Sequence, residues 1–148
     1  EVSQLKTIRV RDAMNPRAMT IPEEMPADEL HDFFFRSKHR SFPVTDPEGR
    51  LTGVMSFSDI EHYPLTEEIK RLKANDFATK QVVTVTADDS LFLSLSRISQ
   101  GDYAILPVID GPGTRRVVGV ISRRDIIAGY ERYVIHRGSP GPSPPDEG

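Results

Sequence analysis

The stretch VVGVISRRDIIAGY at residues 117–130 repeats a pattern that the chain has already used in LTGVMSFSDIEHY at residues 51–63. Both stretches contain, in this order, glycine, an apolar residue, any residue, serine, two further residues, aspartate and isoleucine. A shorter pattern, apolar-Pro-Val-x-Asp, precedes each copy as FPVTD at 42–46 and LPVID at 106–110. Repetition of this kind predicts two homologous structural units of roughly sixty residues each.

Each unit has the same predicted order of elements, which is strand, helix, strand, strand, helix. Apolar and β-branched runs predict the strands AMTI (18–21), SFPVTD (41–46), RLTGVMS (50–56), VVTV (82–85), ILPVID (105–110) and RRVVGVIS (115–122). Pro26 suits the first turn of a helix, and Thr86 with Asp89 resembles a capping box before the matching helix of the second unit. Further helices are expected from Ser56 and Ser122, so the predicted fold class is α/β, of the α+β kind.

The repeat also predicts how the chain is divided. The expected parts are a first unit at 7–63, a polar connector at 64–73, a second unit at 74–132 and a flexible tail, rich in Pro, Gly and Ser, at 133–148. A unit of this size buries little apolar surface alone, so we expect the two units to pack against each other. The three consecutive phenylalanines at 33–35 cannot all face one narrow buried stripe of a helix. Two explanations stay open: one of them contacts the other repeat or a second chain, or the helix has a broad apolar face.

The composition argues against several classes of protein. The net charge is −3 with 28% charged residues, which gives no electrostatic footprint for nucleic acid. The chain has no cysteine, so it forms neither disulfides nor thiolate metal sites, as suits the cytoplasm. No run is apolar enough to cross a bilayer, and the sequence does not begin with methionine. We therefore expect a cytoplasmic module that is part of a larger protein.

The sequence carries no pattern that indicates catalysis. The histidines at 31, 39, 62 and 136 form no i, i+4 ligand pair, so they are interpreted as surface residues and no metal site is predicted. Asp59 and Asp125 belong to separate copies of the repeat, which gives no basis for a catalytic dyad. No phosphate-binding glycine loop or nucleophile elbow is present. We expect a protein that is not an enzyme and requires no cofactor.

The segment Ser122-Arg123-Arg124-Asp125 is the strongest candidate for ligand chemistry. It follows a predicted strand and opens a predicted helix, where free N–H groups attract phosphate. A carboxylate in this position can accept hydrogen bonds from the two ribose hydroxyls, and a guanidinium can hold phosphate with its planar fork. The same Ser-x-x-Asp pattern is also an ordinary helix cap, and these four residues alone favour capping over binding.

Two copies of β-α-β-β-α that carry both patterns resemble a tandem pair of CBS domains, the Bateman module, over about residues 7–132. The resemblance implies that the two repeats pack through their sheets with pseudo-twofold symmetry and leave two clefts. Clefts of this kind often bind adenine nucleotides, so ATP, ADP and AMP are candidate ligands, and the Asp of Ser-x-x-Asp holds the ribose. The resemblance also implies a regulatory module that associates into homodimers.

By position, the resemblance implies two nucleotide sites, each built from both repeats. Cleft A combines the first strand and pre-proline segment of repeat 1 with the Ser-x-x-Asp of repeat 2, namely Met14, Met19, His39, Ser41, Ser122, Arg123 and Asp125. Cleft B combines the equivalent positions of the other repeats, namely Ala78, Val83, Tyr103, Ile105, Ser56 and Asp59. Lys38, Arg40 and Arg124 add positive charge to cleft A, so phosphates are expected there, while Tyr103 can stack on a base in cleft B.

The parent protein is predicted from a resemblance at residues 83–91 and 119–137, VTVTADDSL and GVISRRDIIAGYERYVIHR. These segments resemble the cytosolic C-terminal CBS pair of prokaryotic CLC-type chloride channels and transporters. The resemblance implies that the module modulates a membrane transporter domain of the same polypeptide. Two alternatives stay open, a stand-alone CBS sensor and a purely structural dimerisation module with empty clefts.

Overall fold

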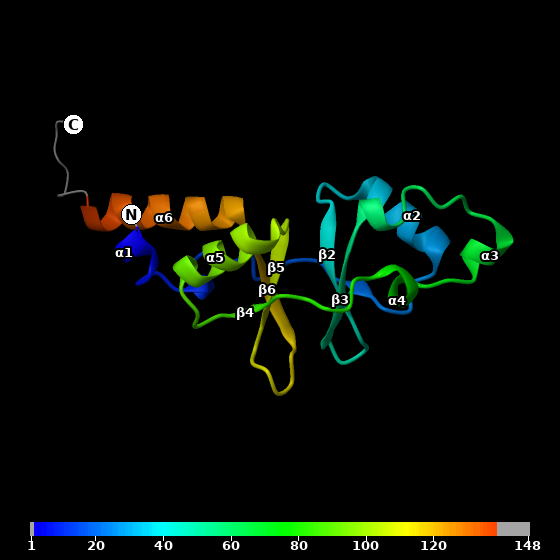
Figure 1. The fold of residues 1–148 in the computed structure, drawn as a ribbon, viewed down its shortest axis with the longest axis horizontal. Helices are drawn as coiled ribbons and strands as arrows, with labels where there is room; N and C mark the ends of the chain where they lie inside the picture. The colour runs from blue at the N-terminus through cyan, green and yellow to red at the C-terminus, as the bar shows by residue number, and fades with distance from the viewer. Residues whose placement is uncertain (1, 139–148) are drawn as a thin grey trace.

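The computed structural model describes residues 2–138, which form two similar halves, each with a three-stranded sheet (Figure 1). The strands are β1 (Ile21–Pro22), β2 (Ser41–Thr45), β3 (Leu51–Ser56), β4 (Val85–Thr86), β5 (Ile105–Ile109) and β6 (Val117–Ser122). In each half a short strand pairs in parallel with the central strand, which pairs in antiparallel fashion with the third. Pro43 lies opposite Val54, and Pro107 lies opposite Val120, so the predicted duplication extends to strand register.

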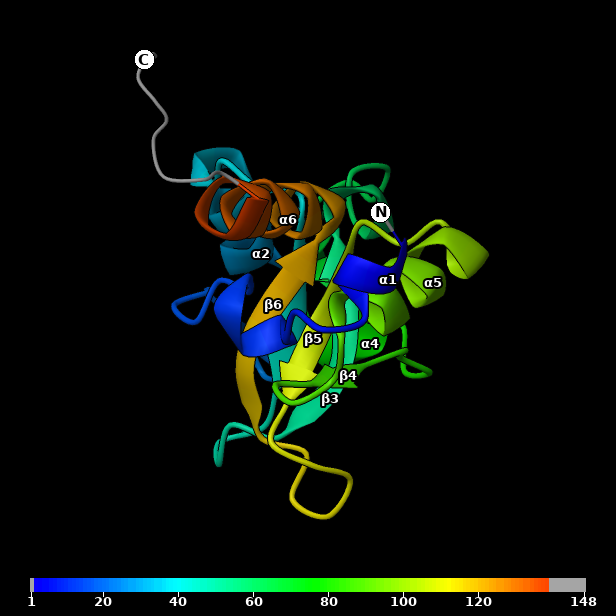
Figure 2. The same ribbon diagram turned by 90° about the vertical axis from the view of Figure 1, so that its left-hand side faces the viewer.

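Helices flank the two sheets. The longer ones are α2 (Ala27–Arg36), α5 (Leu91–Gly101) and α6 (Arg123–Gly138), and the shorter elements are α1 (Val2–Leu5), α3 (Glu67–Lys70), α4 (Ala74–Phe77) and the 3-10 turns η1 (Val10–Asp12) and η2 (Phe57–Asp59). Figure 2 shows α2 and α6 on the same side of the sheets. None of the helices in the described range is both long and apolar enough to span a membrane. The α/β class and the order strand, helix, strand, strand within each repeat are therefore as predicted.

The last helix of each repeat differs in length. After Ser122 the chain forms the 16-residue helix α6, whereas after Ser56 it forms only the three-residue turn η2. Pro64 follows closely in repeat 1, and a proline lacks the N–H that a continuing helix needs. No proline interrupts residues 123–138. The helix predicted from Ser56 is thus a single turn.

Two further predicted boundaries differ in the structure. Asp89 accepts a hydrogen bond from the N–H of Thr86 at 2.7 Å, but the N-cap of α5 is Ser90, whose hydroxyl accepts from Leu93 N–H at 3.1 Å. The Thr86–Asp89 pair therefore fixes the turn before the helix. Helix α6 continues to Gly138, so the first part of the tail predicted from residue 133 is helical, and residues 139–148 lie outside the described range.

The opening segment of each repeat packs into the core of the other repeat. Ile8, Val10 and Ala13 are buried in the core of repeat 2, which also contains Val85, Leu91, Ile98, Leu106, Val108, Ile121 and Ile126. Ala74 is buried in the core of repeat 1 with Ile21, Leu30, Phe34 and Met55. The two repeats are thereby interlocked, because each core needs residues from both sides of a unit boundary.

The longer repeated pattern begins with a glycine, Gly53 or Gly119, at the point where the segment from the other repeat crosses the strand. Asn15 exchanges backbone hydrogen bonds with Val120 at 2.8 and 3.1 Å, and Thr79 exchanges them with Val54 at 2.9 and 2.8 Å. A Cβ atom on Gly119 would lie 2.7 Å from the carbonyl oxygen of Asn15, and a Cβ on Gly53 would lie 2.8 Å from that of Thr79. Only glycine lets these segments cross the strands so closely.

The hairpins join the two sheets at the end far from α2 and α6. Leu51 N–H donates to the Arg115 carbonyl at 2.9 Å, and Val117 N–H donates to the Gly49 carbonyl at 3.0 Å. The Arg116 Nε group also donates to the carbonyl of Glu48 at 3.1 Å. These bonds, together with the exchanged segments, connect the two repeats.

Candidate functional site

A cleft of about 830 Å³ opens between the two repeats. Its lining includes six of the seven residues predicted for cleft A, namely Met19, His39, Ser41, Ser122, Arg123 and Asp125. They come from the segment before β1, from the start of β2 and the segment leading into it, and from the end of β6 with the first turn of α6. These three segments meet because β6 delivers Ser122 beside the crossing strand at Asn15. We keep the name cleft A for this site.

Met14 is the predicted residue that does not line cleft A. It packs against the core of repeat 2, and its Sδ atom would lie 3.1 Å from a Cβ on Gly119. The next residues along the chain line the cleft instead, and sequence reasoning missed them. The additional lining residues are Asn15, Arg17, Ala18, Phe42, Pro43, Ala104, Ile105 and Val120, together with Lys38, Arg40 and Arg124, whose charge was expected there. Arg17 is a basic residue close to Met19, and this charge was the feature of the sequence that could have indicated the additional lining.

Ser122 and Asp125 form the cap that begins α6. Asp125 Oδ2 accepts hydrogen bonds from the Ser122 backbone N–H at 2.9 Å and from its hydroxyl at 3.0 Å. The Asp125 N–H donates back to the Ser122 hydroxyl at 3.2 Å. The capping interpretation of this pattern is therefore confirmed. Every one of these bonds to the carboxylate uses Oδ2, and the residue lines the cleft, so capping does not prevent Asp125 from contacting a ligand.

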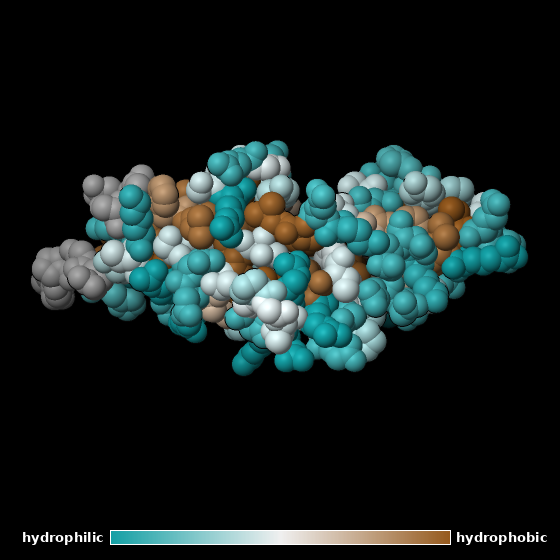
Figure 3. Space-filling view, turned by 60° about the horizontal axis from the view of Figure 1, so that its bottom comes forward, coloured by the Kyte–Doolittle hydropathy of each residue, from teal (hydrophilic) through white to brown (hydrophobic). Residues whose placement is uncertain are grey.

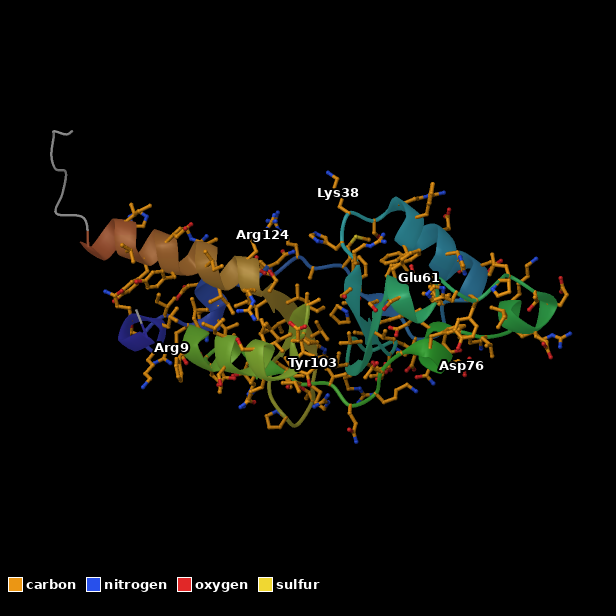
Figure 4. All side chains as sticks on the ribbon, turned by 45° about the horizontal axis from the view of Figure 1, so that its top comes forward. Arg9, Lys38, Glu61, Asp76, Tyr103 and Arg124 are labelled. Atoms are coloured by element: carbon orange, nitrogen blue, oxygen red, sulfur yellow. The ribbon has the colours of Figure 1, made fainter. Side chains whose placement is uncertain are left out.

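Positive charge dominates cleft A. Five Lys or Arg side chains line it, against the single carboxylate of Asp125; they are Arg17, Lys38, Arg40, Arg123 and Arg124. Lys38 and Arg124 come from opposite repeats and lie on the same side of the molecule (Figure 4). Cations gathered in a cleft at the N-terminus of a long helix favour an anionic ligand such as phosphate.

Four of the five cations differ in what holds their side chains. Arg123 donates to the hydroxyl of Ser99 on α5 at 3.3 Å, so this contact draws its guanidinium toward repeat 2. The Arg40 guanidinium lies over the ring of Phe57, 4.4 Å from its centroid. Lys38 and Arg124 are exposed and point to solvent at the rim of cleft A (Figure 4). The rim residues can therefore move toward a bound anion without breaking a contact with the core.

The residues predicted for cleft B are more dispersed. Val83 packs against the core of repeat 2 and Ala78 against that of repeat 1, while Ile105 lines cleft A. Asp59 Oδ2 accepts from Ser56 N–H at 2.8 Å and from its hydroxyl at 3.3 Å, which repeats the cap seen at Ser122. Tyr103 is 42% exposed.

Repeat 1 carries no basic pair at this cap, because Phe57 and Ser58 occupy the positions of Arg123 and Arg124. Phe57 packs toward Phe34 instead, with 5.9 Å between ring centroids. The hydroxyl of Ser58 shares a 2.8 Å hydrogen bond with that of Ser56. The two caps thus share the same Ser–Asp hydrogen bonds and differ strongly in charge.

The histidines do not form a metal centre. Within residues 2–138, no group of three His, Asp or Glu side chains is placed to hold a metal ion. His39, His62 and His136 are exposed, as predicted. His31 differs from the prediction, because it is half-buried on α2 and its Nε2 atom is buried without a hydrogen-bond partner in the described part of the chain.

The comparisons with known proteins agree with this architecture. Homoserine O-acetyltransferase of the archaeon Methanohalobium evestigatum is 28% identical over 124 residues, which are 84% of this chain and 24% of that enzyme. The chain thus spans about a quarter of the length of the first curated relatives that it matches.

Two solved structures share the fold. The CBS domain of a bacterial CNNM/CorC family Mg²⁺ transporter, solved with ATP, has a TM-score of 0.75 and 18% identity, and the match covers 86% of this chain and 90% of that one. The CBS domain pair of protein MJ0100, solved with 5-methylthioadenosine and S-adenosyl-L-methionine, has a TM-score of 0.69 and 22% identity, with 84% and 97% covered.

The family described as "CBS domain" matches twice, at residues 10–65 and 74–132, in agreement with the duplicated sheets and the two equivalent caps. CBS domains are regulatory modules. The chain belongs to the CBS domain family and forms a tandem CBS pair.

Proposed function

We propose that this CBS pair binds an adenine nucleotide in cleft A and uses it to regulate the protein of which it is a part. The observation that carries the proposal is the charge of cleft A, where five cations face one carboxylate at the start of α6. Cleft B lacks the basic pair that follows Ser122, so it is the weaker site. The nucleotide sites of related CBS pairs, one solved with ATP, support the ligand class.

Each part of the nucleotide has a partner in cleft A. The Asp125 carboxylate accepts hydrogen bonds from the ribose hydroxyls through Oδ1, since its capping bonds use Oδ2. Arg124 and Lys38 hold the phosphates from opposite repeats, supported by the N–H groups at the start of α6. Met19 and Ile105 offer apolar surface to the base.

The same charge distribution selects among adenosine compounds. S-adenosyl-L-methionine, present in one related structure, carries a sulfonium and no phosphate. Five cations repel such a group and attract phosphate. We expect ATP to bind at least about tenfold more tightly than AMP, because it brings additional charge-assisted hydrogen bonds. S-adenosyl-L-methionine is expected to bind most weakly.

The regulated partner is also part of the proposal. The resemblance at residues 83–91 and 119–137 favours a CLC-type chloride transporter domain of the same polypeptide. The homoserine O-acetyltransferase relatives favour a metabolic enzyme as the second candidate. In either case the ligand regulates by binding two arrangements of the repeats unequally, and the pair acts as a homodimer.

Calorimetric titration with ATP, ADP, AMP and S-adenosyl-L-methionine tests the ligand. The Asp125→Ala variant is expected to lose about tenfold or more in ATP affinity, because it removes the ribose acceptor. Asp59→Ala is the matched control, since Asp59 caps repeat 1 with the same geometry outside cleft A. Both variants lose a cap worth about 1 kcal/mol, so their stabilities fall alike and only one loses ligand.

The alternative is a structural module whose clefts bind no ligand. It predicts no heat with any of the four compounds and no thermal stabilisation by them. Equal loss of ATP affinity in Asp59→Ala and Asp125→Ala would instead place the nucleotide outside cleft A. Binding that does not weaken between 50 and 500 mM salt would contradict the role of the five cations.

A further inference from the structure

Side-chain oxygen atoms that could coordinate a metal ion are scarce in cleft A. Among the described residues that line it, Asp125 is the only one with a carboxylate, and its Oδ2 atom already accepts hydrogen bonds from Ser122 at 2.9 and 3.0 Å. The Ser122 hydroxyl is engaged in the same cap. The side-chain carbonyl of Asn15 accepts from the Arg17 N–H at 3.0 Å. Most of the side-chain oxygens at this site therefore already have donors of their own.

Acidic residues near cleft A do not make up for this scarcity. Glu29 and Asp32 line a neighbouring hollow on α2 and are not among the residues that line cleft A. Asp32 is also paired with Arg36 of its own helix at 3.1 Å. Within residues 2–138, no three His, Asp or Glu side chains are grouped so that they could hold a metal ion. A metal ion that arrived in cleft A on a ligand would thus find few acidic partners.

The five cations of cleft A compete with a metal ion for the same phosphate oxygens. In nucleotide sites Mg²⁺ is usually held by one or two carboxylates together with the phosphates of the substrate. On ATP it cancels two negative charges and covers oxygens that a guanidinium fork would otherwise bind. It also brings two positive charges close to Arg17, Lys38 and Arg124, which repel them. Cleft A is therefore suited to phosphates that carry no metal ion.

We infer that cleft A binds ATP in its metal-free form and that an excess of Mg²⁺ opposes this binding. The inference rests on the proposed function, because it concerns the same cleft and ligand and specifies which ionic form of ATP is recognised. AMP carries a single phosphate, which chelates Mg²⁺ far more weakly than a triphosphate chain does. The binding of AMP to cleft A is therefore nearly independent of Mg²⁺.

Selection of metal-free ATP makes the occupancy of cleft A depend on two concentrations. An excess of Mg²⁺ converts most ATP into a complex that cleft A does not accept, and the apparent dissociation constant rises in inverse proportion to the metal-free fraction. The preference for ATP over AMP therefore falls as the concentration of Mg²⁺ rises. The module thereby responds to a shortage of Mg²⁺ relative to ATP as well as to the nucleotide itself.

Calorimetric titration of the native chain tests the ionic form directly. ATP and AMP are each titrated once with EDTA and once with Mg²⁺ in large excess over nucleotide, at one ionic strength set with KCl. Mg²⁺ is expected to raise the apparent dissociation constant of ATP at least about tenfold, and that of AMP by less than about twofold. ATP binding that is equal or tighter with Mg²⁺ overturns the inference and leaves the proposed function standing. Absence of ATP binding under both conditions refutes the proposed function and the inference together.

A change of charge at the rim of cleft A tests the physical cause. Lys38 is exposed, and Lys38→Glu replaces a cation with the kind of carboxylate that Mg²⁺ requires. The variant is expected to bind metal-free ATP at least about fivefold more weakly, and its loss of affinity on adding Mg²⁺ to be no more than about threefold. Lys70→Glu makes the same change on α3, at the end of repeat 1 away from repeat 2 (Figure 1), and is expected to keep the native values. An unchanged Mg²⁺ effect in Lys38→Glu, or an equal reduction in Lys70→Glu, overturns the inference.

Discussion

Gly119 shows how one residue fixes the relation between two repeats. Its missing side chain leaves room for the backbone of Asn15, which a Cβ would approach to 2.7 Å. We expect Gly119→Ala to lower the free energy of unfolding by about 1–3 kcal/mol, because the crossing segment must shift. Urea denaturation measures this change.

Gly113 provides the matched control. It lies in the β5–β6 turn, and a Cβ there would meet no atom within 4 Å. Gly113→Ala is therefore expected to change stability by no more than about 0.5 kcal/mol. Equal losses in the two variants would show that the close crossing at Asn15 does not hold the repeats together.

The same interaction closes both β-hairpins: an aspartate accepts hydrogen bonds from other residues of its turn. Hydrogen bonding from the Arg50 backbone N–H at 2.9 Å lowers the pKa of Asp46 below its usual 3.8. The pKa of Asp110 is lowered in the same way, chiefly by the Thr114 hydroxyl at 2.5 Å and also by Arg116 N–H at 2.8 Å. In both turns the ionised carboxylate closes the loop between two strands.

Because folding lowers the pKa of both aspartates, the stability of the protein is expected to fall as the pH falls. The stabilisation from Asp46 and Asp110 is present above the unfolded-state pKa of about 3.9 and is lost as pH falls through the lower folded-state values. We expect the melting temperature of the native chain to fall below about pH 4. The double variant Asp46→Asn, Asp110→Asn should show a shallower fall. Identical curves for the native chain and the double variant would contradict this role.

Much of this element structure could be predicted from the sequence. Strands with apolar-Pro-Val-x-Asp and the caps at Ser56 and Ser122 are local patterns, and the structure has them in the predicted places. The length of the helix after each cap depends on residues further along the chain, and Pro64 shortens the first one. Six of the seven residues predicted for cleft A line it, because the resemblance to tandem CBS pairs places them there by position. Met14 does not, since its burial depends on how closely the chain crosses at Gly119.

Exchange of segments between repeats determines how the whole molecule responds to truncation. Removal of residues 2–13 takes Ile8 and Val10 out of the core of repeat 2, although these residues lie at the start of repeat 1 in the sequence. Fully burying these two side chains is worth about 3–6 kcal/mol in total. We therefore expect the truncated chain to lose hydrogen-exchange protection first in β5 and β6. Earlier loss in β2 and β3 would contradict the exchange.

The surface of the molecule suits a module that works by association. On the face shown in Figure 3, hydrophobic side chains are exposed only in small separate patches among hydrophilic ones. Elsewhere the exposed apolar residues include Phe35 on α2 and Ile127, Val134 and Ile135 on α6, and Figures 1 and 2 show both helices on one side of the sheets. The contacts that transmit a signal are thus expected on that side.

The burial of Val10 beside Ile121 and Ile126 also has a consequence for synthesis on the ribosome. Residues 8–13 are translated before the rest of the pair, but the core that buries them is complete only after β6 and the start of α6 have been translated. While only repeat 1 has been translated, the apolar side chains of that segment stay exposed to water. Slow decoding between residues 60 and 120 would therefore prolong the period in which chaperones must protect it.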